Sequence, residues 1–436
     1  MKLDELRIII KNTIEEHAQE IIDAGEYIWR NAESGYREFK TSKFLIAELQ
    51  KLGLEVKTNL AVTGFRADID TGRPGPTVAI LGELDSLILP NHPECDKTTG
   101  AVHACGHHAC AAGFLGAAIG LVKSAASEHL SGKIALIGCP AEEGIEMDYR
   151  KSLIQESKIK SIAGKSQLIR EGVFDDVDIA FMHHSSTRFG YAGHNGAVNK
   201  KITFRGVSCH AASPHNGRNA LNAMTLALNA IALLRESYSN DSTIRIHGIV
   251  TDGGNAVNIV PNHVSMDYML RSDTVEKMVE LNDRFDKIVM YAAKAAECEA
   301  TIESLNGYMP TWNNDVLGEV MKKSTEFLFP DEEFRGDLPW SNGSTDMGDV
   351  ALIVPAVHGL VPGIGGTLHG IDFHIADPYS AYVKSSMVNA VIAADLLFGD
   401  AETGRKVAEE KKKLMSVAEY IALADKINRT LKSEDI

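Results

Sequence analysis

The chain has 436 residues, of which 44% are hydrophobic and 24% charged, and its formal net charge is −15. This length exceeds one ordinary hydrophobic core, so two domains are expected. No window reaches the roughly 18 uninterrupted apolar residues that a membrane span needs, and an acidic balance without a basic cluster excludes nucleic acid as a partner.

The N-terminal part of the chain reads as helices followed by strands. Apolar residues recur at helical spacing over 3–30 and 41–52, and the first helix carries charges throughout, unlike a signal peptide. Several later segments have strand patterns, namely 55–57, 64–70, 77–81, 133–138 and 178–182. A cytoplasmic location is expected because the N-terminal helix is not a signal peptide. The six cysteines have no framework spacing, which indicates reduced thiols.

Polar residues follow three buried strands at the points where these strands end. Asp85 follows the first, the pair Glu142 and Glu143 follows the second, and His183 and His184 follow the third. Open α/β sheets hold their ligands beyond the carboxyl ends of their strands. We therefore expect these side chains to meet at one edge of a sheet.

The segment His103-Ala104-Cys105-Gly106-His107-His108 precedes a helix of small apolar residues. Three imidazoles and a thiol in six residues are a dense set of metal ligands. Cys105 and His107 are the expected ligands, with His103 and His108 as supporting or surface residues.

Two further features would complete a metal site. Burying both Glu142 and Glu143 without cations would cost several kcal/mol, so one could ligate a metal while the other acts as a general base on a metal-bound water. A glycine-rich loop late in the chain carries His369 and His374, and either could close the site.

A different pattern begins after residue 191. Alternating and helical segments follow in the order β-α-β-β-α-β, at 197–206, 218–236, 243–250, 262–270, 274–297 and 299–304. This is the order of a split ferredoxin-like domain, and the α/β pattern resumes at the helix 316–329. The expected domains are a catalytic domain formed by 1–191 and 307–436, and an inserted domain formed by 192–306.

The chain resembles, over nearly its full length, a family of di-metal metallopeptidases and amidohydrolases that includes aminoacylase, carboxypeptidase G, hippurate hydrolase and the auxin-conjugate hydrolases. The nearest branch is that of aminobenzoyl-glutamate hydrolase subunits and related dipeptidases. The matching segments are GELDSL at 82–87, HACGHH at 103–108, PAEEG at 140–144, HH at 183–184, GVSCHAASPHNGRNALNAM at 206–224, NIVP at 258–261, STDMGD at 344–349 and TLHGIDF at 367–373.

The resemblance implies an α/β fold, with a mixed-sheet phosphorylase/hydrolase-like catalytic domain and an inserted ferredoxin-like α+β dimerisation domain. It also implies two divalent ions, zinc or manganese. Their ligands would be Cys105 as the bridge, His107, Glu143, His184 and His369. His183 competes with His184, and His374 is the alternative to His369.

The same resemblance assigns residues outside the ligand set. Glu142 would be the general base, and His210 would reach across a homodimer formed through 192–306 to stabilise the oxyanion. Asn258 and Arg271 would hold the substrate, Arg271 through a bidentate grip on a free carboxylate. Whether Asp85 has a direct role stays open.

The resemblance implies a hydrolase that cleaves an amide bond next to a free carboxylate, in a small substrate of the N-acyl amino acid or aminobenzoyl-glutamate type. A dipeptidase of the same family is the alternative. Two other classes are a thiol amidase with Cys105 as nucleophile and His107 as its base, and a metal-binding relative without turnover, against which the intact Glu142 argues.

Overall fold

The computed structural model describes residues 1–435, which group into two compact units. The first unit consists of Met1–Gly193, Thr311–Trp340 and Asp346–Val417. The second consists of His194–Pro310, Ser341–Thr345 and 418–435. Among the described residues, no helix has both the length and the apolar character that crossing a bilayer requires.

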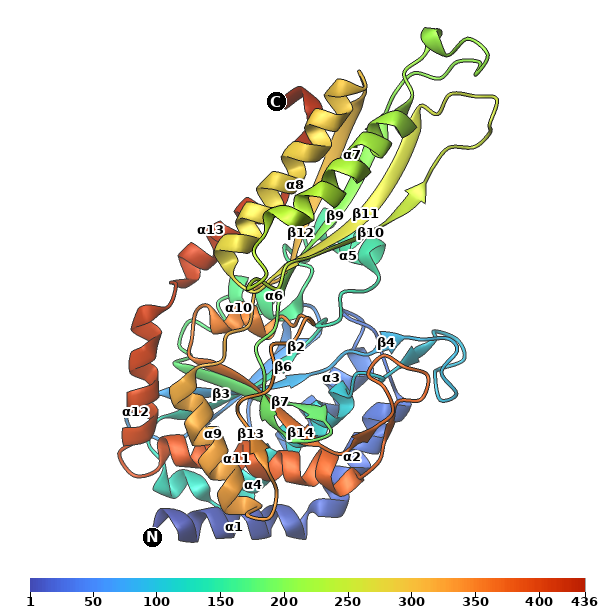
Figure 1. The fold of residues 1–436 in the computed structure, drawn as a ribbon. Coiled ribbons are helices and arrows are strands. Elements are labelled where there is room, and N and C mark those ends of the chain that lie inside the picture. The colour runs from blue at the N-terminus through green and yellow to red at the C-terminus, as the bar shows by residue number, and fades with distance from the viewer. Residues whose placement is uncertain (436) are drawn as a thin grey trace. The chain divides into compact units, whose positions relative to one another are not determined.

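The first unit is built on an eight-stranded mixed sheet with the strand order β1-β2-β6-β3-β7-β14-β8-β13 (Figure 1). Its strands are β1 Val56–Leu60, β2 Gly64–Asp70, β3 Thr77–Glu83, β6 Lys133–Cys139, β7 Ile179–Ser186, β8 Phe189–Tyr191, β13 Phe334–Arg335 and β14 Ala356–Pro362. β3 pairs in parallel with β6 and with β7, and β7 pairs in parallel with β14. The residues that follow these strands therefore emerge at one edge of the sheet, as expected.

The helices of this unit are α1 Leu3–Glu16, α2 Ala18–Arg30, α3 Phe39–Lys51, α4 His107–Lys123, α5 Met147–Gln155, α6 Gly164–Arg170, α9 Asp315–Leu328, α10 Met347–Ala351, α11 Ser385–Leu397 and α12 Glu402–Ala408. The apolar pattern of 3–30 forms two helices rather than one, because the backbone leaves the helical conformation at His17, where ψ is 13°. Two hairpins add the short strands β4 Leu87–Ile88 with β5 Ala101–Val102, and β15 Ile364–Gly365 with β16 His374–Ile375.

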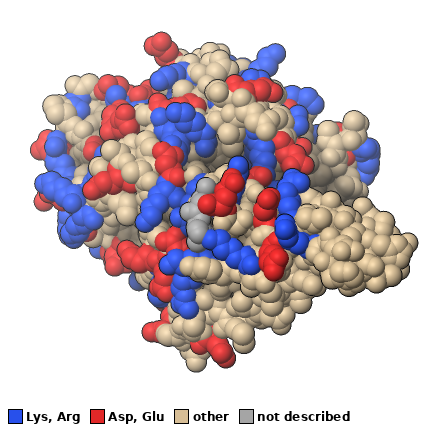
Figure 2. Space-filling model, turned by 90° about the horizontal axis from the view of Figure 1, so that it is seen from above, with Lys and Arg blue, Asp and Glu red and all other residues tan. Residues whose placement is uncertain are grey.

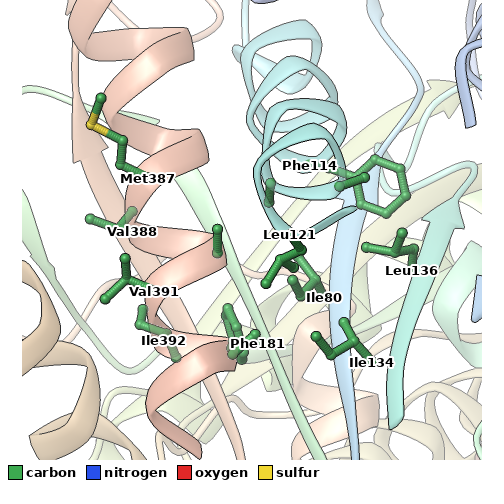
Figure 3. Packing of buried hydrophobic residues seen from close by; sticks show 14 of the residues in the cluster. Ile80, Phe114, Leu121, Ile134, Leu136, Phe181, Met387, Val388, Val391 and Ile392 are labelled. Carbon is green, nitrogen blue, oxygen red and sulfur yellow. The ribbon is translucent and has the colours of Figure 1, made fainter. Parts of the chain in front are cut away.

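The core of the first unit lies between the sheet and the helices α4 and α11. Figure 3 shows Leu121 of α4 beside Ile80 of the sheet, and Phe114 of α4, Met387 of α11 and Phe181 of the sheet belong to the same buried cluster. Small residues let the two helices approach closely, since a Cβ on Gly116 would overlap Ser386 Oγ. The long run of small residues in α4 is thus explained by this contact, which fixes the helix that begins with His107.

The second unit has the ferredoxin-like order that the sequence predicts. Its elements are β9 Gly196–Arg205, α7 Ala220–Leu234, β10 Arg245–Asp252, β11 His263–Ser272, α8 Val275–Ala295 and β12 Glu299–Tyr308. The sheet order is β10-β11-β9-β12-β17, and every neighbouring pair is antiparallel. The α+β architecture of this unit is confirmed.

The C-terminal tail differs from the expected assignment. The sequence pattern placed all of 307–436 in the catalytic domain, but 418–435 groups with the second unit. After α13 (Val417–Ile427), the strand β17 (Arg429–Lys432) pairs antiparallel with β12. Arg429 Nη2 lies 2.7 Å from Asp286 Oδ2, and the other oxygen of this carboxylate lies 2.5 Å from the buried Lys200 ammonium. Strand pairing and this charge cluster hold the tail on the second unit.

Charged side chains of both signs are interspersed on the face drawn in Figure 2. Lysine and arginine alternate there with aspartate and glutamate, and the described residues of that face form no continuous basic patch.

Candidate metal centre

Side chains from four segments of the first unit converge beyond the sheet edge. Cys105 precedes α4 and His107 is its first residue, Glu143 follows β6, His184 lies in β7 and His369 lies in the loop after β15. Cys105 Sγ is 3.4 Å from His184 Nε2 and 3.3 Å from His369 Nε2. His369 Nε2 is also 3.3 Å from Glu143 Oε1. All five expected ligands are therefore brought together.

The donor atoms form overlapping groups, each with its atoms within 4.8 Å of one another. Cys105 belongs to a group with His107 and His184 and to another with Glu143 and His369. A third group joins His107 and Glu143 to Glu142. Cys105, His107 and Glu143 each belong to two of these groups, so the groups form one connected set of donor atoms.

The structure separates the histidine alternatives. His183 is buried and its Nδ1 lies 2.7 Å from Asn389 Oδ1, because neighbouring residues of a strand face opposite sides of the sheet. His374 Nδ1 lies 2.9 Å from the carbonyl oxygen of Asp372. Neither His183 nor His374 belongs to any group of described side chains positioned to hold a metal.

Asp85 orients two members of the cluster at once. Its Oδ1 lies 3.0 Å from His107 Nδ1, and its Oδ2 accepts the backbone N–H of Glu143 at 2.8 Å. His107 therefore turns Nε2 toward the cluster, where that nitrogen lies 3.8 Å from Glu142 Oε2. The sequence placed Asp85 at the right strand end but assigned it no role.

The electrostatics of the cluster fit bound cations. Burial, reinforced by the charge of Glu143, raises the pKa of the Cys105 thiol well above its usual range. Burial together with the charges of Glu83 and Glu143 likewise raises the pKa of Glu142. Among the described residues, Glu83 Oε2, His107 Nε2 and Glu143 Oε1 are buried without a hydrogen-bond partner. These nitrogen and carboxylate atoms, together with the neighbouring thiol of Cys105, suit a divalent metal such as zinc.

The loop that carries Glu142 and Glu143 is clamped by residues that the sequence pattern did not single out. Ala141 has a positive φ of 54°, and its N–H donates to the buried Glu38 carboxylate at 2.8 Å. From the other side, the buried Arg150 guanidinium donates to the carbonyl oxygens of Ala141 and Glu143. These contacts fix the direction in which the two glutamates leave β6.

Residues 192–297 match the peptidase dimerisation domain of the M20 family. A p-aminobenzoyl-glutamate hydrolase chain of Escherichia coli is 30% identical over 325 residues, which is 71% of this chain and 63% of that protein. Residues 192–297 are thus identified as an M20 peptidase dimerisation domain. The Xaa-Arg dipeptidase of Mus musculus, another relative, is 29% identical over 79% of this chain and 77% of its own length.

Solved M20 structures share the fold. A dinuclear metal-binding M20 peptidase, the YXEP protein of Bacillus subtilis, matches with a TM-score of 0.67 at 18% identity and covers 88% of this chain and 99% of its own. The aminobenzoyl-glutamate utilization protein of Klebsiella pneumoniae matches with a TM-score of 0.63 at 20% identity, covering 91% of this chain and 98% of its own.

The remaining predicted residues lie in the second unit. His210 and Asn258 are exposed neighbours, since the N–H of Ala211 donates to the carbonyl oxygen of Asn258 at 3.0 Å. Arg271 lies in β11, and its Nη1 donates to the carbonyl oxygen of Asn342 at 2.8 Å. His210 and Asn258 are therefore brought together within this unit.

The two histidines that the sequence predicts as supporting or surface residues are both buried. His103 and His108 have ring centroids 5.2 Å apart, and the His108 ring lies 4.8 Å from that of Trp29 and 5.7 Å from that of Tyr382. The surface position considered for them is wrong. Both rings instead lie in the interior of the first unit.

Proposed function

We propose that the protein is a metal-dependent hydrolase that cleaves an amide bond next to a free carboxylate. The observation that carries this proposal is the cluster of Cys105, His107, Glu143, His184 and His369 with Glu142 beside it. Relatives of the chain are named as hydrolases of p-aminobenzoyl-glutamate or of IAA-amino acids, and as dipeptidases. The substrate proposed here is of the N-acyl amino acid or aminobenzoyl-glutamate type, with a dipeptide as the alternative.

The five clustered side chains would hold two divalent ions, zinc or manganese, with Cys105 as the shared ligand. Such ions polarise a carbonyl and lower the pKa of water from about 16 toward 7. The exposure of the cluster supports access for a small substrate, because the His369 side chain is 52% exposed while Glu143 is 8% exposed.

Glu142 is the proposed general base. Its carboxylate faces His107 Nε2 at 3.8 Å and lies beside Glu143 on a clamped loop, so its position relative to the ligands is fixed. It would take a proton from the attacking water and return it to the leaving amine. A glutamate with a raised pKa is suited to this exchange near neutral pH.

Residues of the second unit would act on the substrate. His210 is proposed to stabilise the oxyanion from across a homodimer formed through 192–306, Asn258 to contact the substrate, and Arg271 to bind its free carboxylate. A guanidinium is suited to that role because it binds a carboxylate with two parallel hydrogen bonds. The match of 192–297 to a peptidase dimerisation domain supports the homodimer. A cytoplasmic location is proposed with it, and all six cysteines are free thiols.

A hydrolysis screen tests the proposal. Metal-free protein is loaded with Mn²⁺ or Zn²⁺ and assayed on N-acyl amino acids, aminobenzoyl-glutamate and dipeptides. We expect turnover that a chelator abolishes and that Glu142→Ala lowers severely, while Glu94→Ala, at an exposed glutamate of the 90–100 loop, leaves it unchanged. No turnover of any substrate would refute the proposal.

The two rival classes give different results in the same assay. A thiol amidase would survive the chelator and be inactivated by thiol alkylation. The raised pKa of Cys105 disfavours it, because thiol nucleophiles need a lowered pKa. A non-catalytic relative would bind metal and show the same residual activity with and without Glu142.

A further inference from the structure

The buried side chain of Lys165 contacts Glu83, which lies next to the proposed metal ligand His107. The proposed mechanism gives this lysine no role. Lys165 belongs to α6, and its side chain is fully buried. Its ammonium lies 2.6 Å from Glu83 Oε1 and 2.5 Å from Asp346 Oδ1, and both carboxylates are fully buried as well. Burying one cation and two anions is costly unless they are paired with good geometry, so this arrangement needs a reason.

The two partners of Lys165 belong to an acidic group that reaches the cluster. Glu83, Glu142 and Asp346 each place an oxygen within 4.8 Å of the others, which is a spacing able to hold a cation. The second oxygen of Glu83, Oε2, has no hydrogen-bond partner and lies 3.3 Å from His107 Nε2. Glu83 therefore connects the ammonium to the proposed metal ligands.

We propose that the Lys165 ammonium occupies a third cation position, formed by Glu83, Glu142 and Asp346, and so limits the centre to two divalent ions. The proposal rests on the dinuclear centre of the proposed function. The Lys165 ammonium offsets part of the negative charge of Glu83, Glu142 and Asp346. Because it is covalently part of the chain, a chelator cannot remove it as it would remove a metal ion. Without the Lys165 ammonium, these three carboxylates would form a third site for a divalent ion, made of oxygen ligands, next to the two proposed metal positions.

The structure allows the ammonium to be removed while its partners stay in place. Asp346 Oδ2 accepts the backbone N–H of Lys165 at 2.9 Å, and this bond persists in any variant at that position except proline. The start of α6 is fixed independently, because Gly164 N–H donates to Ala141 O at 3.2 Å and a Cβ on Gly164 would overlap Pro140 O. Lys165→Ala should therefore open the position without moving the acids.

Metal counting by mass spectrometry on full-length protein tests the proposal. Each protein is loaded with excess Mn²⁺ or Zn²⁺ and freed of unbound metal. We expect Lys165→Ala to retain one more ion per chain than the wild type. Lys165→Met, which fills the space without a charge, should not gain an ion, and Lys165→Ala combined with Asp346→Ala should lose the extra one. Ethylammonium, which restores an ammonium in the vacated space, should lower the gain.

Equal metal content in wild type and Lys165→Ala would overturn the proposal, as would an extra ion that persists in the methionine or double variant. If Lys165→Ala folds only when divalent ions or ethylammonium are supplied, the cation role is supported. Failure to fold even with them overturns it. A wild type that holds no metal would instead refute the proposed function, so the two failures are distinguishable.

Discussion

Asp85 positions two proposed metal ligands with a single carboxylate. Its Oδ1 accepts from His107 Nδ1 and its Oδ2 accepts from the backbone N–H of Glu143. In an Asp85→Asn variant one of the two carboxylate oxygens is replaced by an amide NH₂. This donor then faces either His107 Nδ1–H or the Glu143 backbone N–H, which are donors themselves. If the oxygen stays on Glu143, the amide favours the His107 tautomer protonated on Nε2, which is the nitrogen that faces the cluster.

Loss of such a partner weakens metal binding about 10- to 100-fold, equivalent to about 1.4 to 2.8 kcal/mol. Asp85→Asn should reach the upper end, because it removes the charge and also creates the donor conflict. Asp85→Ala creates no such conflict, and the backbone carbonyl of residue 85, 3.0 Å from His107 Nδ1, still holds the ring. The alanine variant should therefore lose less affinity than the asparagine variant.

Competition titration of metal-free protein against a chromophoric chelator measures this affinity, with circular dichroism as a check of the fold. Asp331→Asn, at an exposed carboxylate, is the matched control and should bind like the wild type. Wild-type affinity in Asp85→Asn would refute the reasoning. So would a weaker affinity in Asp85→Ala than in Asp85→Asn, because the donor conflict would then have no effect.

Three further predictions concern other buried groups. His184→Ala should lose metal, whereas His183→Ala should keep its metal and lower only the melting temperature; metal analysis and thermal melts separate them. Arg150→Met should lower the free energy of unfolding by about 3 to 5 kcal/mol, since buried backbone carbonyls lose a charged donor. Arg37→Met, with a side chain 47% exposed, should cost less than about 1 kcal/mol in the same urea titration. Burial lowers the pKa of Lys200 to about 8, below the roughly 10.4 of an unfolded lysine. The unfolded state therefore binds more protons between these values, and stability should rise with pH from about 8 to about 10.4 in the wild type but less in Lys200→Met. Equal metal loss in both histidine variants, equal costs in both arginine variants, or an unchanged pH slope would contradict these expectations.

Local patterns were sufficient to predict much of the fold and to single out Cys105 and His107, whereas the rest of the expected ligand set depended on the family resemblance. The continuous apolar runs predicted buried parallel strands, and the alternating segments after residue 191 predicted the order of the second unit. Cys105 and His107 stand two residues apart at the start of a helix, so one short segment was enough to single them out. The choice between His183 and His184 was different, because it depends on which face of β7 each residue takes.

The charges beneath the cluster could not be predicted in this way. Lys165 is separated in sequence from Glu83 by 82 positions and from Asp346 by 181. A single lysine at the start of a short helix looks like a surface residue until the fold buries it. Strand β17 in the tail was not predicted for a related reason. It is four residues long, and none of its residues is fully buried, so it has no apolar strand pattern. Both features depend on long-range pairing rather than on local pattern.

Hydrogen bonds between segments of the chain hold the proposed metal ligands together without a bound ion. The backbone N–H of His369 donates to Ala104 O at 2.8 Å, which ties the late loop to the segment before α4. Ser185 Oγ donates to Gly106 O at 3.1 Å, which ties β7 to the same segment. Small metal domains that lack such ties unfold without their ion. Here the ligand positions are supported by hydrogen bonds and a packed core, so chelation should empty the centre while leaving the fold intact, and metal affinity can be compared between variants in one folded state.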